Sequence, residues 1–105
     1  MKFNNPYWPL KTRMQLLQRW IIVHSIIYYE YDSSVVSDIV FDDNAKQLYE
    51  MIVNNKVEFK KTRYHYCFKD FDGTTGFDLY NKLCEDDKYC LEADALNLMD
   101  KKFAK

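Results

Sequence analysis

The feature that most constrains the fold is the apolar stretch from Leu10 to Tyr31. Apolar residues recur there at three- and four-residue spacing, the period of an α-helix. They lie in two stripes. The first follows Leu10, Met14, Leu17, Ile21, Ser25 and Tyr28, and the second follows Leu16, Trp20, Val23 and Ile27. A helix with apolar side chains over so much of its circumference must be buried on more than one side. The stretch therefore predicts the central helix of a small bundle.

Length and composition favour one mainly α-helical domain over residues 1–105. A chain of 105 residues, 48% of them hydrophobic, is long enough to bury a single core. Only two glycines and two prolines are present, which leaves few turn signals for a fold of many strands. We predict a small helical bundle built on a helical hairpin over residues 10–55, with the second half, residues 56–105, packed onto it.

The second helix of the hairpin is predicted from Asp38 to about Val53. Asp32-Ser33-Ser34 supplies turn chemistry, and Ser37 is a good N-cap residue. The predicted buried face consists of Val40, Phe41, Ala45, Leu48, Tyr49 and Ile52. Before the hairpin, Met1 to Pro9 is predicted to be an irregular arm, whose aromatic residues either pack on the core or form an exposed patch for a partner.

Residues 56–71 have two interpretations. Tyr64, Tyr66 and Phe68 alternate along the chain, as in an extended segment with one face turned inward. The same aromatics follow a basic run that contains Lys56, Lys60, Lys61 and Arg63, which could contact phosphates and stack on bases. Because the net charge of −1 gives no overall attraction to nucleic acid, we predict an extended connector and no nucleic-acid partner.

The last third of the chain is predicted to hold two more helices. One runs from about Gly76 to Cys84 and is capped by Thr74 or Thr75. The other begins at Glu85, and its predicted apolar positions are Tyr89, Leu91, Ala95, Leu98, Met99 and Phe103.

No catalytic or metal-binding pattern stands out. Cys67, Cys84 and Cys90 lack the spacing of a zinc site or a disulfide framework. An EF-hand loop that started at Asp70 would need glycine at position 75 and glutamate at position 81, where the chain has Thr75 and Asn81. His24 lies among apolar residues and is interpreted as a core histidine, with a ligand role as the alternative. We predict a protein that is not an enzyme and holds no metal.

One stretch resembles a known family. The pattern Tyr28-Tyr29…Asp32…Ser37-Asp38-x-x-Phe41-Asp42…Leu48…Glu50 is similar to the small N-terminal helical domain of bacterial NAD-dependent DNA ligases. The similarity covers about residues 13–53. That domain holds the nicotinamide mononucleotide (NMN) half of NAD. The resemblance implies that Tyr28, Tyr29 and Phe41 stack on nicotinamide, and that Asp38 and Asp42 make polar contacts.

Two features qualify this resemblance. Phe41 stands where the family has tyrosine, so the ring is kept and the hydroxyl is lost. The same residues would also serve as the core and cap of a helical hairpin without any ligand, and this second interpretation stays open.

The second half of the chain points to a narrower group. YHYCFKDFDGTTGFDLYNKL, residues 64–83, looks like a segment of small ligase-related proteins of phages and prophages that consist of this domain alone. The resemblance implies a non-catalytic phage-type accessory protein that binds and modulates a host protein, as a host-takeover or anti-defence inhibitor. The alternative is a stand-alone domain that binds NMN or NAD.

The expected location is the cytoplasm of a host cell. The N-terminus has no apolar run that could act as a signal sequence, and His24 and Ser25 interrupt the most apolar stretch, Trp20 to Tyr31. That stretch is also too short to span a bilayer, so we expect no membrane association.

Overall fold

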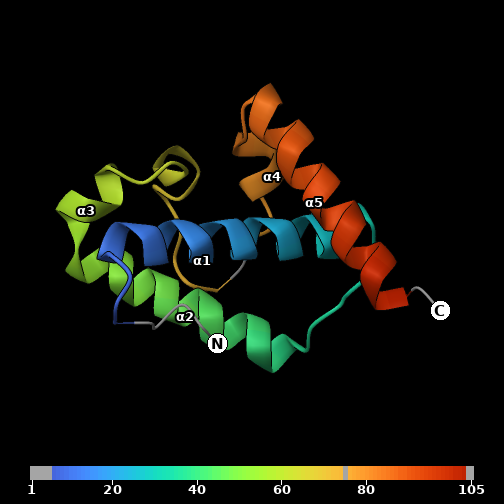
Figure 1. Cartoon of the computed structure of the whole chain (residues 1–105), viewed down its shortest axis with the longest axis horizontal. Coiled ribbons are helices and arrows are strands. Elements are labelled where there is room, and N and C mark those ends of the chain that lie inside the picture. The colour runs from blue at the N-terminus through green and yellow to red at the C-terminus, as the bar shows by residue number, and fades with distance from the viewer. Residues whose placement is uncertain (1–5, 75, 104–105) are drawn as a thin grey trace.

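The computed structural model describes residues 6–74 and 76–103, which form a small bundle around one central helix. Helix α1 (Leu10–Ser25) is central, and a π-helical turn (Ile26–Glu30) continues it. Figure 1 shows α2 (Asp38–Asn54) running along one side of α1, while α5 (Glu85–Phe103) crosses its far end. The described residues contain no strand, so the prediction of a mainly α-helical bundle is confirmed.

The core is built around α1, as its two apolar stripes predicted. Met14 and Leu17 are fully buried, and all seven residues from Ile21 to Ile27 are buried. A run of seven covers every side of a helix, so neighbours must pack around its whole circumference. They contribute the buried side chains of Ala45, Leu48, Phe59, Tyr64, Phe68, Leu79, Leu83, Leu91 and Ala95.

Helix α2 begins where the sequence predicted. The Ser37 hydroxyl oxygen accepts a hydrogen bond from the backbone N–H of Val40 at 3.3 Å, which is the expected N-cap. The buried face of α2 is narrower than predicted. Ala45 and Leu48 are buried, but Val40 and Tyr49 are exposed, and for these two the prediction was wrong. The physical reason is that α2 lies at the edge of the bundle and turns one stripe toward α1.

The prediction of an extended connector over residues 56–71 is wrong. The segment contains α3 (Lys56–Lys60) and a 3₁₀ turn (His65–Cys67). Tyr64 and Phe68, four residues apart, are both buried, whereas Tyr66 is only half-buried. The aromatic residues therefore contact the core at helical spacing, and the alternation in the sequence does not correspond to a strand.

The basic run in this segment is partly neutralised by acidic neighbours. Lys61 pairs with Glu58 at 3.4 Å, and Arg63 pairs with Asp87 at 2.7 Å. The exposed Lys61–Glu58 pair adds little stability, but both pairs reduce the local positive charge that a phosphate would encounter.

The C-terminal elements follow the prediction in outline. Helix α4 (Leu79–Lys82) is shorter than the predicted helix over residues 76–84, and Thr75, one of its two suggested caps, lies outside the described residues. Helix α5 starts at Glu85 and buries Leu91 and Ala95, as predicted. Tyr89 was expected to be buried and is 80% exposed, because it lies on the outer face of α5. None of the described helices is long and apolar enough to cross a membrane.

Polar contacts fasten α5 to the rest of the bundle. Asp87 is buried and accepts hydrogen bonds from the Arg63 guanidinium at 2.7 Å and from the Tyr66 hydroxyl at 2.5 Å. One turn and a half further on, Glu92 accepts hydrogen bonds from the hydroxyls of Tyr31 and Tyr80. These contacts tie α5 to segments that are distant in the sequence.

The surroundings of Asp87 stabilise the ionised form of its carboxyl group in the folded protein. Burial alone would raise the pKa of this carboxyl, but hydrogen bonds from Arg63, Tyr66 and Cys84 outweigh burial and hold the pKa below its usual 3.8. A carboxyl whose pKa is lower in the folded state stabilises the fold above the unfolded pKa. That stability is lost as the pH falls through the folded pKa.

We predict that Asp87→Ala lowers the free energy of unfolding by about 1–3 kcal/mol at pH 7, because Arg63 and Tyr66 lose their acceptor. Urea denaturation followed by circular dichroism measures the loss. Asp86→Ala is the matched control, since Asp86 is the preceding residue of the same helical turn and is exposed. At pH 3 the difference between wild type and Asp87→Ala should narrow. Equal losses in the two variants would contradict this account of Asp87.

Candidate functional site

A cleft with a volume of about 240 Å³ lies between the end of α1 and the first half of α2. It contains all five residues that the sequence singled out for ligand contact. Its lining consists of His24, Ser25, Tyr28, Tyr29, Ser34, Val35, Val36, Asp38, Phe41, Asp42 and Thr74. The volume is below the roughly 300–1,000 Å³ of pockets that enclose drug-sized ligands. The cleft therefore suits an aromatic ring with part of a sugar better than a whole dinucleotide.

The π-helical turn carries the two tyrosines of the cleft. Tyr28 and Tyr29 leave the core there, and their side chains are 50% and 39% exposed. The two ring centroids are 4.8 Å apart, with the planes at 69°, so the rings meet edge to face. Single π-helical turns occur frequently at functional sites.

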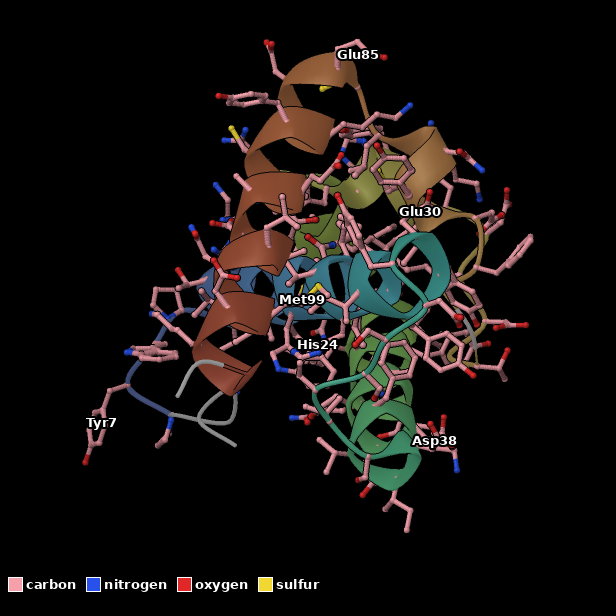
Figure 2. All side chains as sticks on the ribbon, turned by 90° about the vertical axis from the view of Figure 1, so that its right-hand side faces the viewer. Tyr7, His24, Glu30, Asp38, Glu85 and Met99 are labelled. Atoms are coloured by element: carbon pink, nitrogen blue, oxygen red, sulfur yellow. The ribbon has the colours of Figure 1, made fainter. Side chains whose placement is uncertain are left out.

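The loop between Glu30 and Asp38, the two residues labelled at its ends in Figure 2, contributes Ser34, Val35 and Val36 to the wall. Asp32 adopts a left-handed backbone conformation with φ of 49°, which aspartate tolerates better than most residues. The Ser33 N–H donates to the Ile27 carbonyl at 3.1 Å, and the Ser34 hydroxyl donates to the Val36 carbonyl at 2.6 Å. These bonds fix the path by which the chain enters α2.

Helix α2 supplies two carboxylates and one ring. Asp38 and Asp42 are four residues apart, so they lie on the same side of the helix. Phe41 also lines the cleft, and its ring centroid is 6.0 Å from that of Trp20, which belongs to the packed part of the bundle. Phe41 is therefore both a packing residue and a wall of the cleft, as each of the two interpretations of the sequence required.

Two further lining residues come from the last turn of α1. His24 is 6% exposed and packs against Trp20, with ring centroids 4.2 Å apart and planes at 41°. Ser25 is 2% exposed, and its hydroxyl has no hydrogen-bond partner among the described residues. The spacing of His24 and Tyr28, four residues apart on one helical run, is the signal that could have placed His24 in the site. The interpretation of His24 as a core residue agrees with its burial, but it also borders the cleft.

Thr74 reaches the cleft because the loop before α4 lies close against both helices of the hairpin. Gly73 has φ of 85°, and a side chain there would come within 2.9 Å of the Tyr49 Cβ. A side chain on Gly76 would come within 2.0 Å of the Ser25 hydroxyl. Only glycine allows this approach at both positions. No local pattern in the sequence could have revealed that Thr74 lines the same cleft as Tyr28 and Asp42.

The cleft carries negative charge. Asp38 and Asp42 line it, and among the described residues of its wall there is neither lysine nor arginine. Burial lowers the pKa of His24 from 6.5 to about 4, so the imidazole is neutral at pH 7. An aromatic cation or a donor-rich ligand suits this lining better than an anion. No group of three His, Cys, Asp or Glu residues in the described part of the chain could hold a metal ion.

Compared with models of known protein families, with curated proteins and with solved structures, the chain matches none of them.

We predict that the stability of the protein falls as the pH drops from 6.5 to 5. His24 has a lower pKa when folded than when unfolded, so in this window the unfolded chain binds more protons. The full linkage is about 1.4 kcal/mol per pH unit, and we expect about 1 kcal/mol over the window because the cleft is open to water.

Chemical denaturation of wild type and His24→Gln at several pH values measures the effect. The variant should lose the slope between pH 6.5 and 5, a range in which carboxyl groups contribute little because their unfolded pKa values lie near 4. An unchanged slope in His24→Gln would show that another group is responsible.

Proposed function

We propose that this protein binds a nicotinamide nucleotide in the cleft between α1 and α2, without catalysing a reaction on it. The observation that carries the proposal is that one cleft is lined by Tyr28, Tyr29, Asp38, Phe41 and Asp42. The resemblance to the ligase domain implied that these five residues contact the nicotinamide nucleotide. They occupy two helical elements separated by a loop, so a shared cleft was not guaranteed by their positions in the sequence.

The chemistry of the cleft supports this ligand. A pyridinium ring offers a flat cationic face, and aromatic side chains attract such a face through their π systems. Tyr28 and Phe41 supply rings from two different elements, one from the π-helical turn and one from α2. Asp38 and Asp42 can accept hydrogen bonds from the carboxamide and the ribose hydroxyls while they favour the positive ring.

The size of the cleft indicates which half of NAD it would hold. A volume of about 240 Å³ accommodates a ring and part of its sugar, and the remainder of a dinucleotide would lie outside. We therefore expect the nicotinamide end to enter, so that NMN and NAD bind through the same group.

Isothermal titration calorimetry of the full chain with NMN tests the proposal. We expect saturable heat with a dissociation constant on the order of 1 mM or tighter. Asp42→Asn should weaken binding about tenfold, because a charge-assisted hydrogen bond is lost while the shape is kept. Asp43→Asn is the matched control, since Asp43 is the next residue of α2, is exposed and does not line the cleft. No heat with millimolar NMN or NAD would refute the proposal.

A second candidate function is the binding of a host protein, as in the phage-type modulators that the sequence resembles. The observation that favours it is the aromatic cluster, defined as Tyr28, Tyr29 and Phe77. The Tyr29 and Phe77 ring centroids are 5.4 Å apart at 89°, and the three side chains are 50%, 39% and 66% exposed. Contiguous exposed aromatics of this kind commonly anchor protein partners.

Affinity capture from bacterial host lysate tests this candidate. Phe77→Ser should abolish recovery of a stoichiometric partner, because it removes the most exposed ring of the cluster. Tyr89→Ser is the control, since Tyr89 is a similarly exposed aromatic on α5 outside the cluster. Phe77 does not line the cleft, so NMN binding should survive Phe77→Ser. Recovery of no stoichiometric partner by wild type would count against this function.

A further inference from the structure

The charge of the cleft sets a requirement that nicotinamide mononucleotide meets poorly. NMN combines a cationic ring with a 5′-phosphate, so it is a net anion at pH 7. The cleft presents the carboxylates of Asp38 and Asp42 and, among the described residues that line it, no lysine or arginine. Phosphate sites in proteins normally supply cationic side chains or several exposed backbone N–H groups. The charged side chains of this cleft therefore match the ring and not the phosphate.

Among the described elements that line the cleft, the start of α2 is the one suited to attract a phosphate, because helix N-termini carry partial positive charge. That end is already occupied by the chain's own groups. The Ser37 hydroxyl accepts from the Val40 N–H at 3.3 Å, and Asp38 places a carboxylate at the first helical position. A phosphate there would meet the negative charge of Asp38.

Lys46 and His24, the basic residues beside or in the cleft on α2 and α1, do not compensate. Lys46, one turn beyond Asp42, is exposed and does not line the cleft. His24 borders the cleft as a neutral imidazole at pH 7. The phosphate of a bound mononucleotide would consequently have to remain in solvent beside two carboxylates.

We propose that the preferred ligand is a net-cationic pyridinium nucleoside, nicotinamide riboside without its 5′-phosphate, and that the phosphate weakens binding. This rests on the proposed function, since it assigns the same cleft, but it reverses the order of affinity that a nucleotide site would show. Two carboxylates near the ligand in partly solvated surroundings make the difference on the order of tenfold at low salt.

Calorimetry of the unmodified full chain at pH 7 tests the inference with three ligands: nicotinamide riboside, NMN and the neutral dihydronicotinamide riboside. In 20 mM salt we expect nicotinamide riboside to bind about tenfold more tightly than NMN. The gap should narrow to about twofold in 500 mM salt, because screening weakens both the attraction of the ring and the repulsion of the phosphate. The dihydro form should bind more weakly than the riboside, since it lacks the cationic ring.

A charge variant provides the matched control. In Asp38→Asn/Asp42→Asn the preference for the riboside over NMN should fall to about equal affinity, whereas Asp43→Asn should keep it. Circular dichroism checks that both variants are folded.

The outcomes separate the two proposals. If NMN binds as tightly as the riboside or more tightly, the preference is wrong, and nicotinamide-nucleotide binding stands. If the dihydro form equals the riboside, the cationic ring has no role and the preference is again overturned. If none of the three ligands gives heat, both proposals fall.

Discussion

The burial of residues 21–27, the last turn of α1 and the start of the π-helical turn that continues it, is the constraint on which the rest of the structure depends. The five aliphatic side chains in this stretch, Ile21, Ile22, Val23, Ile26 and Ile27, each contribute about 1.5–3 kcal/mol when fully removed from water. They point to all sides of the helix, so no single neighbour can cover them. Helices α2 and α5 and the short elements between them have to surround α1, and this requirement determines where each of them lies.

The same constraint explains why the cleft forms at the end of α1. The helix is covered as far as Ile27, and the next residues, Tyr28 and Tyr29, are exposed. The π-helical turn changes the direction of successive side chains at this point, so two adjacent tyrosines reach the rim together. A concave site with aromatic walls thus arises where the buried helix leaves the core.

The attachment of α5 also supports the cleft. Tyr31 follows the π-helical turn directly, and its hydroxyl donates a hydrogen bond to Glu92 of α5. This bond is the main reason why the pKa of Tyr31 rises to about 12, so the hydroxyl remains a donor throughout the neutral range. The contact fixes the end of the turn that carries Tyr28 and Tyr29. The polar fastening of α5 and the geometry of the cleft are in this way connected.

Much of the fold could be predicted from the sequence because the relevant signals are local. The stripes of α1 and the Ser37 cap depend on residues within a few positions of one another. The cap was placed correctly, and the stripes were correct except for Tyr28, which lies in the π-helical turn and is half exposed. The prediction for residues 56–71 was wrong because the structure of this segment depends on contacts with distant residues. Tyr64 and Tyr66 alternate as in a strand. The Tyr66 hydroxyl, however, donates a hydrogen bond to Asp87, 21 residues away, and tertiary contacts of this kind override a local strand pattern.

Part of the candidate site could likewise be predicted from local sequence, and part depends on distant contacts. Tyr28, Tyr29, Asp38, Phe41 and Asp42 lie within 15 consecutive positions and could be singled out by their pattern. Thr74 enters only because Gly73 and Gly76 let a later loop press against α1 and α2. The negative charge of the cleft could not be predicted from the sequence either. It depends on which lysines and arginines lie away from the cleft, and only the assembled fold determines this.

Packing and ligand contact are compatible roles for the residues of this cleft. One part of the Phe41 ring packs toward Trp20, while the ring also lines the cleft. Asp38 stabilises the start of α2 through the helix dipole, and its carboxylate is also available to a ligand. Substitution of such a residue changes stability and affinity together, so a loss of binding in one variant cannot by itself separate the roles. A change of charge on the ligand leaves the protein unaltered. The response to ligand charge therefore reports on the cleft alone, and for this reason the electrostatics of Asp38 and Asp42 are the most direct route from this structure to its function.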